Sequence, residues 1–82
     1  MKGLAGRVAL VTGAGGPMGF AVAQRLAEDG MRLVLTDISG TRLEQSRAAL
    51  ADGGAQVAAL RGDAMQRAEA QAVVDAGVQA FG

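Results

Sequence analysis

The chain of 82 residues contains no cysteine, no histidine, no tyrosine and no tryptophan. Without cysteine it has no disulfide, no thiol nucleophile and no thiolate ligand for a metal. Without histidine it lacks the commonest metal ligand and a common general base, so we expect no metal site. Phe20 and Phe81 are the only aromatic residues, too few for a platform on which nucleic-acid bases stack.

Charge and hydropathy exclude further classes of protein. Eight basic and eight acidic residues are scattered along the chain and cancel to a formal net charge of zero. No block of like charge favours a nucleic acid or an anionic membrane as partner. No hydrophobic run approaches the roughly 18–20 residues of a membrane span, and residues 1–7 lack the apolar core of a signal peptide. We therefore expect no nucleic-acid or membrane partner and a cytoplasmic location.

The order of hydrophobic and glycine-rich segments predicts alternating strands and helices. Continuous apolar runs over residues 7–12, 32–37 and 56–61 predict parallel strands covered on both faces. Helical periodicity predicts helices over residues 18–29, from a cap at Ser39 or Thr41 to about residue 52, and over residues 66–81. One side of the second helix would carry Leu43, Arg47 and Leu50.

This βαβαβα order predicts the fold class. Short connections favour an α/β fold with a Rossmann-like parallel sheet, right-handed crossovers and the strand order 3-2-1. The first two helices would cover one face of the sheet and the last helix the other. We expect residues 1–82 to form one segment, truncated at Gly82 where a doubly wound fold would continue. So short a chain buries only about 60% of its unfolded surface, so we expect marginal stability and self-association through the edge of the first strand.

A glycine-rich turn, residues 13–16, lies between the first strand and the first helix. Glycine lets the backbone approach a pyrophosphate closely and takes positive φ angles without steric cost. The helix that follows presents free N–H groups to the phosphates. We therefore predict that Gly13, Gly16, Met18 and Gly19 bind a dinucleotide; the alternative is a tight turn without a ligand.

Acidic residues follow the second and third predicted strands, at the same edge of the sheet as the turn. Asp37 can accept both hydroxyl groups of an adenosine ribose and would repel a 2′-phosphate, which favours NAD over NADP; alternatively, it caps a helix. Asp63 can accept the adenine amino group, with the Ala64 N–H facing the ring. Taken alone, the position of Asp63 favours a cap for the last helix.

Together these residues resemble the short-chain dehydrogenase/reductase family over the whole chain. Thr12-Gly13 with Gly19 resembles the family's Thr-Gly-x-x-x-Gly-x-Gly turn, and residues 6–11 resemble its first strand. Asp37 matches the acidic residue of its NAD-preferring members, and Gly62-Asp63-Ala64 resembles its adenine-contacting Asp-Val. Val73, Val74 and Phe81-Gly82 resemble its fourth helix. The resemblance implies an oxidoreductase that transfers hydride between a nicotinamide cofactor and an alcohol or ketone. This chain would be its N-terminal, NAD-binding fragment.

The chain departs from the family at the turn and in the catalytic residues. Pro17 replaces the middle glycine and has no N–H for a phosphate, but its fixed φ suits the first position of a helix and pushes Gly16 toward extended geometry. The family uses a Ser, a Tyr and a Lys for catalysis, whereas this chain has no Tyr and its only Lys is Lys2. We therefore predict no catalytic residues in this chain.

Three functions remain open from the sequence. The chain is the cofactor-binding start of an NAD-dependent oxidoreductase, a non-catalytic module that binds NAD or another adenine nucleotide, or an inert gene fragment. A methyltransferase usually carries an acid directly before the glycines, where Thr12 stands, and a flavin site needs a Gly-x-Gly-x-x-Gly turn that Met18 interrupts. Both are therefore less favoured.

Overall fold

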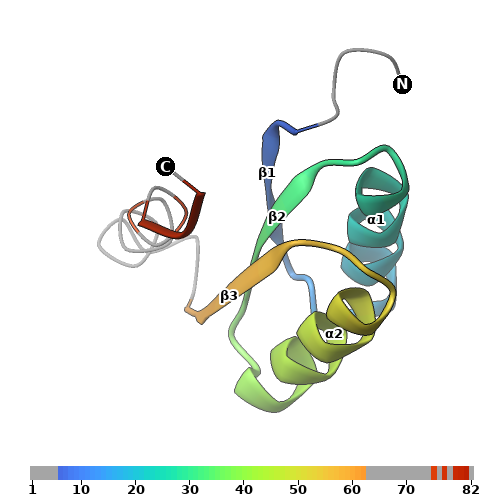
Figure 1. Ribbon diagram of the computed structural model, residues 1–82. Coiled ribbons are helices and arrows are strands. Elements are labelled where there is room, and N and C mark those ends of the chain that lie inside the picture. Colours follow the sequence, from blue (N-terminus) through green and yellow to red (C-terminus); the bar gives the residue numbers. More distant parts are fainter. Residues whose placement is uncertain (1–5, 63–74, 76, 78, 82) are drawn as a thin grey trace.

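The computed structural model describes residues 6–62, 75, 77 and 79–81 (Figure 1). The elements are β1 (Val8–Thr12), α1 (Pro17–Glu28), β2 (Arg32–Asp37), α2 (Gly40–Asp52) and β3 (Val57–Arg61). Residues 75, 77 and 79–81 are helical, in agreement with the last predicted helix, and the rest of that helix lies outside the described residues. The predicted starts and ends of β1, α1 and β3 are each within one residue of those observed.

Local chemistry explains where the two described helices begin and end. Pro17 is the first residue of α1, where its missing N–H costs no hydrogen bond. Ser39, not Thr41, caps α2, and its hydroxyl accepts a hydrogen bond from the Arg42 N–H at 3.3 Å. Gly30 and Gly54 follow the helices with φ of +83° and +96°, as expected of glycines that end a helix.

The three strands form a parallel sheet in the order β1-β2-β3. This order is compatible with the predicted 3-2-1, which gives the same neighbours read from the other edge. Leu10 lies beside Val34, and Val34 lies beside Ala58. Strand β2 is therefore central, and its residues 33–36 are all buried.

The helices cover the two faces of the sheet as the sequence predicts. Helices α1 and α2 lie on one face, and the helical residues near the C-terminus lie across the sheet from them (Figure 1). On that second face, a Cβ atom at Gly77 would lie 3.0 Å from Val34 Cγ2. Arg32 at the start of β2 donates to the Phe81 carbonyl at 3.1 Å, and its guanidinium lies 5.3 Å from the centre of the Phe81 ring. These contacts join the end of the described chain to the central strand.

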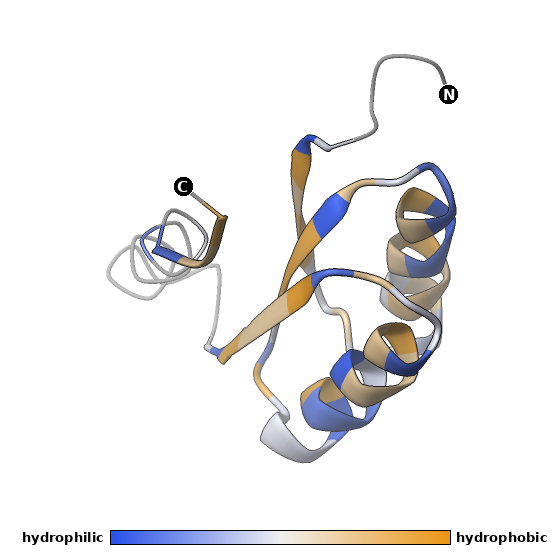
Figure 2. Cartoon of the chain, in the orientation of Figure 1, coloured by the Kyte–Doolittle hydropathy of each residue, from blue (hydrophilic) through white to orange (hydrophobic). Residues whose placement is uncertain are grey.

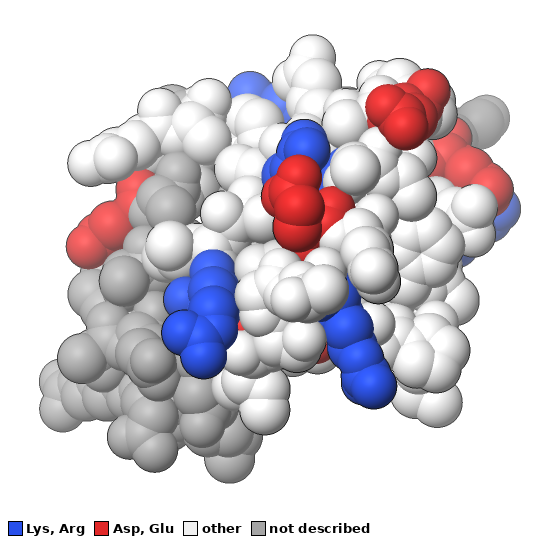
Figure 3. All heavy atoms as spheres, turned by 90° about the horizontal axis from the view of Figure 1, so that it is seen from below, with Lys and Arg blue, Asp and Glu red and all other residues white. Residues whose placement is uncertain are grey.

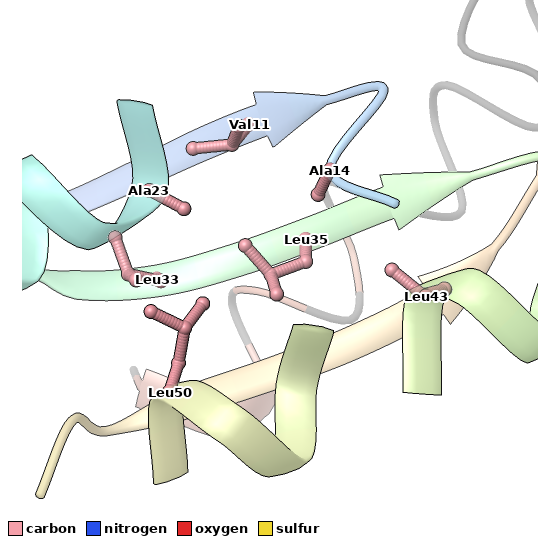
Figure 4. Packing of buried hydrophobic residues seen from close by; sticks show 7 residues of the cluster. All are labelled: Val11, Ala14, Ala23, Leu33, Leu35, Leu43 and Leu50. Carbon is pink, nitrogen blue, oxygen red and sulfur yellow. The ribbon is translucent and has the colours of Figure 1, made fainter. Parts of the chain in front are cut away.

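The main core lies between the sheet and the helix pair. Its buried members are Val11, Ala14, Ala23, Leu33, Leu35, Leu43 and Leu50 (Figure 4). The strands are predominantly hydrophobic, whereas both helices mix hydrophobic and hydrophilic residues (Figure 2), which is typical of helices that bury one face.

The buried residues of α2 are Leu43, Ser46 and Leu50. Arg47, predicted on the same side as the two leucines, is partly exposed and forms two hydrogen bonds with Glu44, at 2.8 and 2.6 Å. Ser46 occupies the buried position instead and is only 7% exposed. Residue 46 follows Leu43 by three positions and precedes Leu50 by four, so it shares their face of the helix.

Candidate functional site

The carboxyl ends of all three parallel strands meet at one edge of the sheet. Thr12, Asp37 and Arg61 end β1, β2 and β3; the pairing register places Thr12 beside Thr36, the neighbour of Asp37, and Asp37 beside Arg61. Figure 3 views the molecule from below Figure 1 and looks onto this edge, where basic and acidic side chains are interspersed and form no continuous patch of one sign. In open α/β sheets, ligands bind outside this edge.

The glycine-rich turn begins directly after β1 with a residue in the left-handed backbone conformation. Gly13 has a φ of +64°, a conformation that L side chains rarely adopt. The Gly16 N–H donates to the Gly13 carbonyl at 3.0 Å, and the Ala14 N–H donates to the Thr36 carbonyl of β2 at 3.0 Å. The turn is therefore closed on itself and continues the β1–β2 hydrogen-bond ladder.

Gly19 lies against the backbone of the turn. A Cβ atom at this position would overlap the Gly13 carbonyl oxygen and lie 2.7 Å from its carbonyl carbon. The close contact of α1 at Gly19 is therefore with the backbone of the turn itself. The start of α1 thus depends on both glycines: Gly13 adopts a positive φ, and Gly19 leaves room for the Gly13 carbonyl.

Pro17 is accommodated as the sequence predicts. Gly16 has extended geometry, with φ −86° and ψ 162°. The Phe20 N–H donates to the Gly16 carbonyl at 2.9 Å, the first bond of α1. The N–H groups of Met18 and Gly19 precede that bond, in the part of a helix whose amides have no intrahelical partner. They are the amides that α1 can offer to an anion.

Asp37 joins the turn to the start of α2. Its Oδ2 accepts a hydrogen bond from the Gly15 N–H and its Oδ1 from the Ser39 N–H, both at 2.8 Å. A carboxylate has about four acceptor sites, so these two bonds leave acceptor capacity for ligand hydroxyl groups. Asp37 is therefore not a cap alone, since it also holds a residue 22 positions earlier in the chain.

Two residues beside the turn were not found from the sequence. A Cβ atom at Gly15 would lie 2.6 Å from Arg42 Cβ and 3.0 Å from Asp37 Oδ2, so Arg42 packs directly on the turn. Ser46 donates from its hydroxyl to the Ala14 carbonyl at 2.8 Å. The helical spacing of Ser46 with Leu43 and Leu50 was the available signal, because it puts a hydroxyl on an otherwise apolar face.

The predicted adenine contacts, Asp63 and Ala64, both lie outside the described residues. Gly62, directly before them, is buried, and its N–H donates to the Asp37 carbonyl at 3.0 Å. Thr36 donates from its hydroxyl to the Gly62 carbonyl at 3.3 Å. The chain therefore leaves β3 immediately beside the end of β2.

An open hollow of about 500 Å³ lies on the other side of the turn, along β1 and α1. Its lining includes Leu10, Val11, Met18 and Val22. Leu10 is 49% exposed and Met18 is 81% exposed, whereas Val11 is buried. The edge of β1 is thus apolar, although only one of its faces is open.

Neither a metal cluster nor a membrane-spanning helix is found among the described residues. Among them, no group of three or more Asp, Glu, His or Cys residues is arranged to hold a metal ion. No helix in this part of the chain is both long enough and apolar enough to span a membrane.

The parallel β-α-β arrangement with a glycine-rich turn after β1 and an acid at the end of β2 is typical of dinucleotide-binding α/β domains. Comparison with known proteins identifies the family. Residues 7–82 match the family described as short chain dehydrogenase. The chain therefore belongs to the short-chain dehydrogenase/reductase family.

The name of one relative states an activity, and the descriptions of two similar solved structures state a bound cofactor. Levodione reductase from Leifsonia aquatica is 40% identical over 78 residues, which cover 93% of this chain and 29% of that protein. A short-chain dehydrogenase/reductase from Burkholderia phymatum, solved in complex with NAD, superposes with a TM-score of 0.93 at 40% identity, over 99% of this chain and 29% of the other. L-sorbose reductase from Gluconobacter frateurii, solved with NADPH and L-sorbose, superposes with a TM-score of 0.91 at 30% identity, over 98% of this chain and 31% of the other. The chain thus spans about 30% of the length of its relatives.

Proposed function

We propose that this chain binds the adenosine and pyrophosphate parts of NAD, as the N-terminal cofactor-binding part of an oxidoreductase that acts on an alcohol or a ketone. The observation that carries the proposal is the hydrogen bond between the Gly15 N–H and Asp37 Oδ2. It brings the phosphate turn and the ribose-binding acid together from positions far apart in the sequence. The cofactors named for the relatives support a nicotinamide dinucleotide.

The residues of the site fit such a cofactor. Gly13, Gly15 and Gly16 carry no side chain that would keep a phosphate from the backbone of the turn, and the N–H groups of Met18 and Gly19 lie at the positive end of the α1 dipole. Asp37 offers carboxylate oxygens at the end of β2 for the ribose hydroxyls. We propose that Asp63 and Ala64 contact the adenine.

We further propose that NAD is preferred over NADP because Asp37 repels the 2′-phosphate. Two unit charges 4 Å apart in water interact by about 1 kcal/mol, or roughly fivefold in affinity, and by more where water is excluded. Titration of the chain with NADH and with NADPH tests this directly. We expect tighter binding of NADH by the wild type and a reduced difference in Asp37→Asn.

Asp52→Asn is the matched control, because it removes an exposed carboxylate from the C-terminal end of α2, the helix whose N-terminal end follows Asp37. It should leave the ratio of the two affinities unchanged. Equal affinities of the wild type for NADH and NADPH would exclude the discriminating role of Asp37. No binding of either cofactor would exclude the proposed function.

The chain by itself should bind the cofactor without catalysing its reduction or oxidation. It has no Tyr, and its only Lys is Lys2. Ser39 and Ser46 are bonded within or beside α2, to the Arg42 N–H and the Ala14 carbonyl. Turnover of NADH by the purified chain with a panel of ketones would contradict this expectation.

We also propose that the isolated chain self-associates through β1. Its outer edge has no neighbouring strand among the described residues, and Val8 and Leu10 are 44% and 49% exposed. Unpaired apolar edges favour pairing with another chain. Sedimentation velocity should show dimers or larger species that Leu10→Lys reduces and Gln24→Lys, on the exposed side of α1, does not. A wild type that is monomeric at all concentrations would refute the proposal.

A further inference from the structure

Ser46 carries the only buried hydroxyl on the inner side of α2 among the described residues, and it contacts the turn. Its side chain is 7% exposed and lies between two leucines of the core face, Leu43 and Leu50. The hydroxyl donates to the Ala14 carbonyl at 2.8 Å across 32 positions of sequence. Ala14 itself is fully buried.

With this bond, both the N–H and the carbonyl group of Ala14 have a hydrogen-bond partner. The Ala14 N–H is bound by the Thr36 carbonyl of β2, and the Ala14 carbonyl is bound by Ser46 of α2. The Ala14 carbonyl shares its peptide unit with the Gly15 N–H, which donates to Asp37. Two consecutive residues of the turn are therefore fixed from outside the turn by groups on β2 and α2.

We propose that Ser46 is a positioning residue for the phosphate turn. By holding the Ala14 peptide in one orientation, it sets the direction of the N–H groups that follow. Its consequence for cofactor affinity rests on the proposed function, whereas its effect on the turn does not. Alanine would form the helix better, and a hydroxyl in an apolar core costs stability unless it is hydrogen-bonded. The bond to Ala14 is therefore the reason for a serine at this position.

Three variants separate this role from a general contribution to folding. Ser46→Ala removes the donor and leaves the Ala14 carbonyl without that partner. Ser46→Thr keeps the hydroxyl and adds one methyl group beside an open hollow of about 370 Å³, lined in part by Ser46, Gly15 and Pro17. Leu50→Val is the matched control, since it trims a buried residue of the same helix face and leaves the turn untouched.

The first measurement is amide hydrogen exchange, followed by NMR, and it needs no ligand. We expect the N–H groups of Gly15 and Gly16 to exchange about tenfold faster in Ser46→Ala, because losing the partner of a buried carbonyl corresponds to a factor of about this order. Amides in the β2–β3 ladder should change no more than in Leu50→Val. Ser46→Thr should restore the wild-type rates. Should Ser46→Ala not fold, Ser46→Cys, which keeps the volume but is a weak donor, carries the same comparison.

The second measurement is the dissociation constant of NADH. We expect it to rise about tenfold in Ser46→Ala and to stay within about twofold of wild type in Leu50→Val and Ser46→Thr. Exchange rates in Ser46→Ala that match those of Leu50→Val would overturn the positioning role. Absence of NADH binding by the wild type would instead refute the proposed function, and the exchange rates would still decide the role of Ser46.

Discussion

Replacing Gly19 by alanine tests whether the contact between α1 and the turn determines their geometry. Alanine favours a helix interior over glycine by about 1 kcal/mol, so propensity alone predicts a more stable protein. The structure predicts the opposite, because the new Cβ atom would overlap the Gly13 carbonyl and come within 3.1 Å of Ala14 Cα. All of these are backbone atoms, which cannot rotate away as a flexible side chain can.

The size of the effect follows from three contributions. Overpacking of a close contact costs about 1–3 kcal/mol. Displacing the Gly13 carbonyl also weakens its 3.0 Å hydrogen bond from the Gly16 N–H, worth about 1 kcal/mol. The gain in helix propensity offsets about 1 kcal/mol. We therefore expect a net loss of about 1–3 kcal/mol in the free energy of unfolding, or roughly 5–20 °C in Tm for a chain of this size.

Thermal and urea unfolding followed by circular dichroism measures this loss. Gly53→Ala is the control, because Gly53 has a φ of −81° and a Cβ atom there would lie 3.5 Å or more from its neighbours. That substitution should be neutral or stabilise by about 0.4–1 kcal/mol. If Gly19→Ala were as stable as Gly53→Ala, the close contact between α1 and the turn would not exist in solution.

Two other predictions concern contacts away from the turn. Arg32→Met should lower the midpoint of urea unfolding, because it removes the hydrogen bond to the Phe81 carbonyl and the contact with its ring. An unchanged midpoint together with unchanged protection of the Phe81 region from solvent exchange would contradict the docking of this end of the chain on β2. The pKa of Glu44 is lowered, mainly by its hydrogen bond to Arg47. Because folding lowers this pKa, the pair stabilises the native state above the usual glutamate range, and that contribution is lost as the pH falls through it. Glu44→Gln should therefore have a small effect at neutral pH that disappears in acid, measured as the difference in urea midpoints, and a difference that grows in acid would have the wrong sign for this pair.

The sequence alone determined the features that depend on neighbouring residues. The apolar runs of β1 and β2 specify strands, and the glycine-rich segment between strand and helix specifies a tight turn, because these properties are local. Pro17 illustrates the same point. Its ring fixes φ wherever it stands, so its place at the start of α1 and the extended geometry of Gly16 followed without knowledge of the fold. The acid at the end of β2 was also found, since parallel strands end at one edge of the sheet.

Tertiary structure alone decided which groups complete the site. Arg47 has the helical spacing of a core residue, but the longer reach of its guanidinium lets it bond Glu44 at the surface, while the small hydroxyl of Ser46 fits beneath α2. Val11 is buried and Leu10 is exposed on the same edge strand, since only one face of β1 meets α1 and the core. The bonds from Ser46 to Ala14 and from Gly15 to Asp37 join segments 32 and 22 positions apart. Such bonds depend on how closely α2 and the end of β2 approach the turn, and these distances are set by the packing of all the side chains between them.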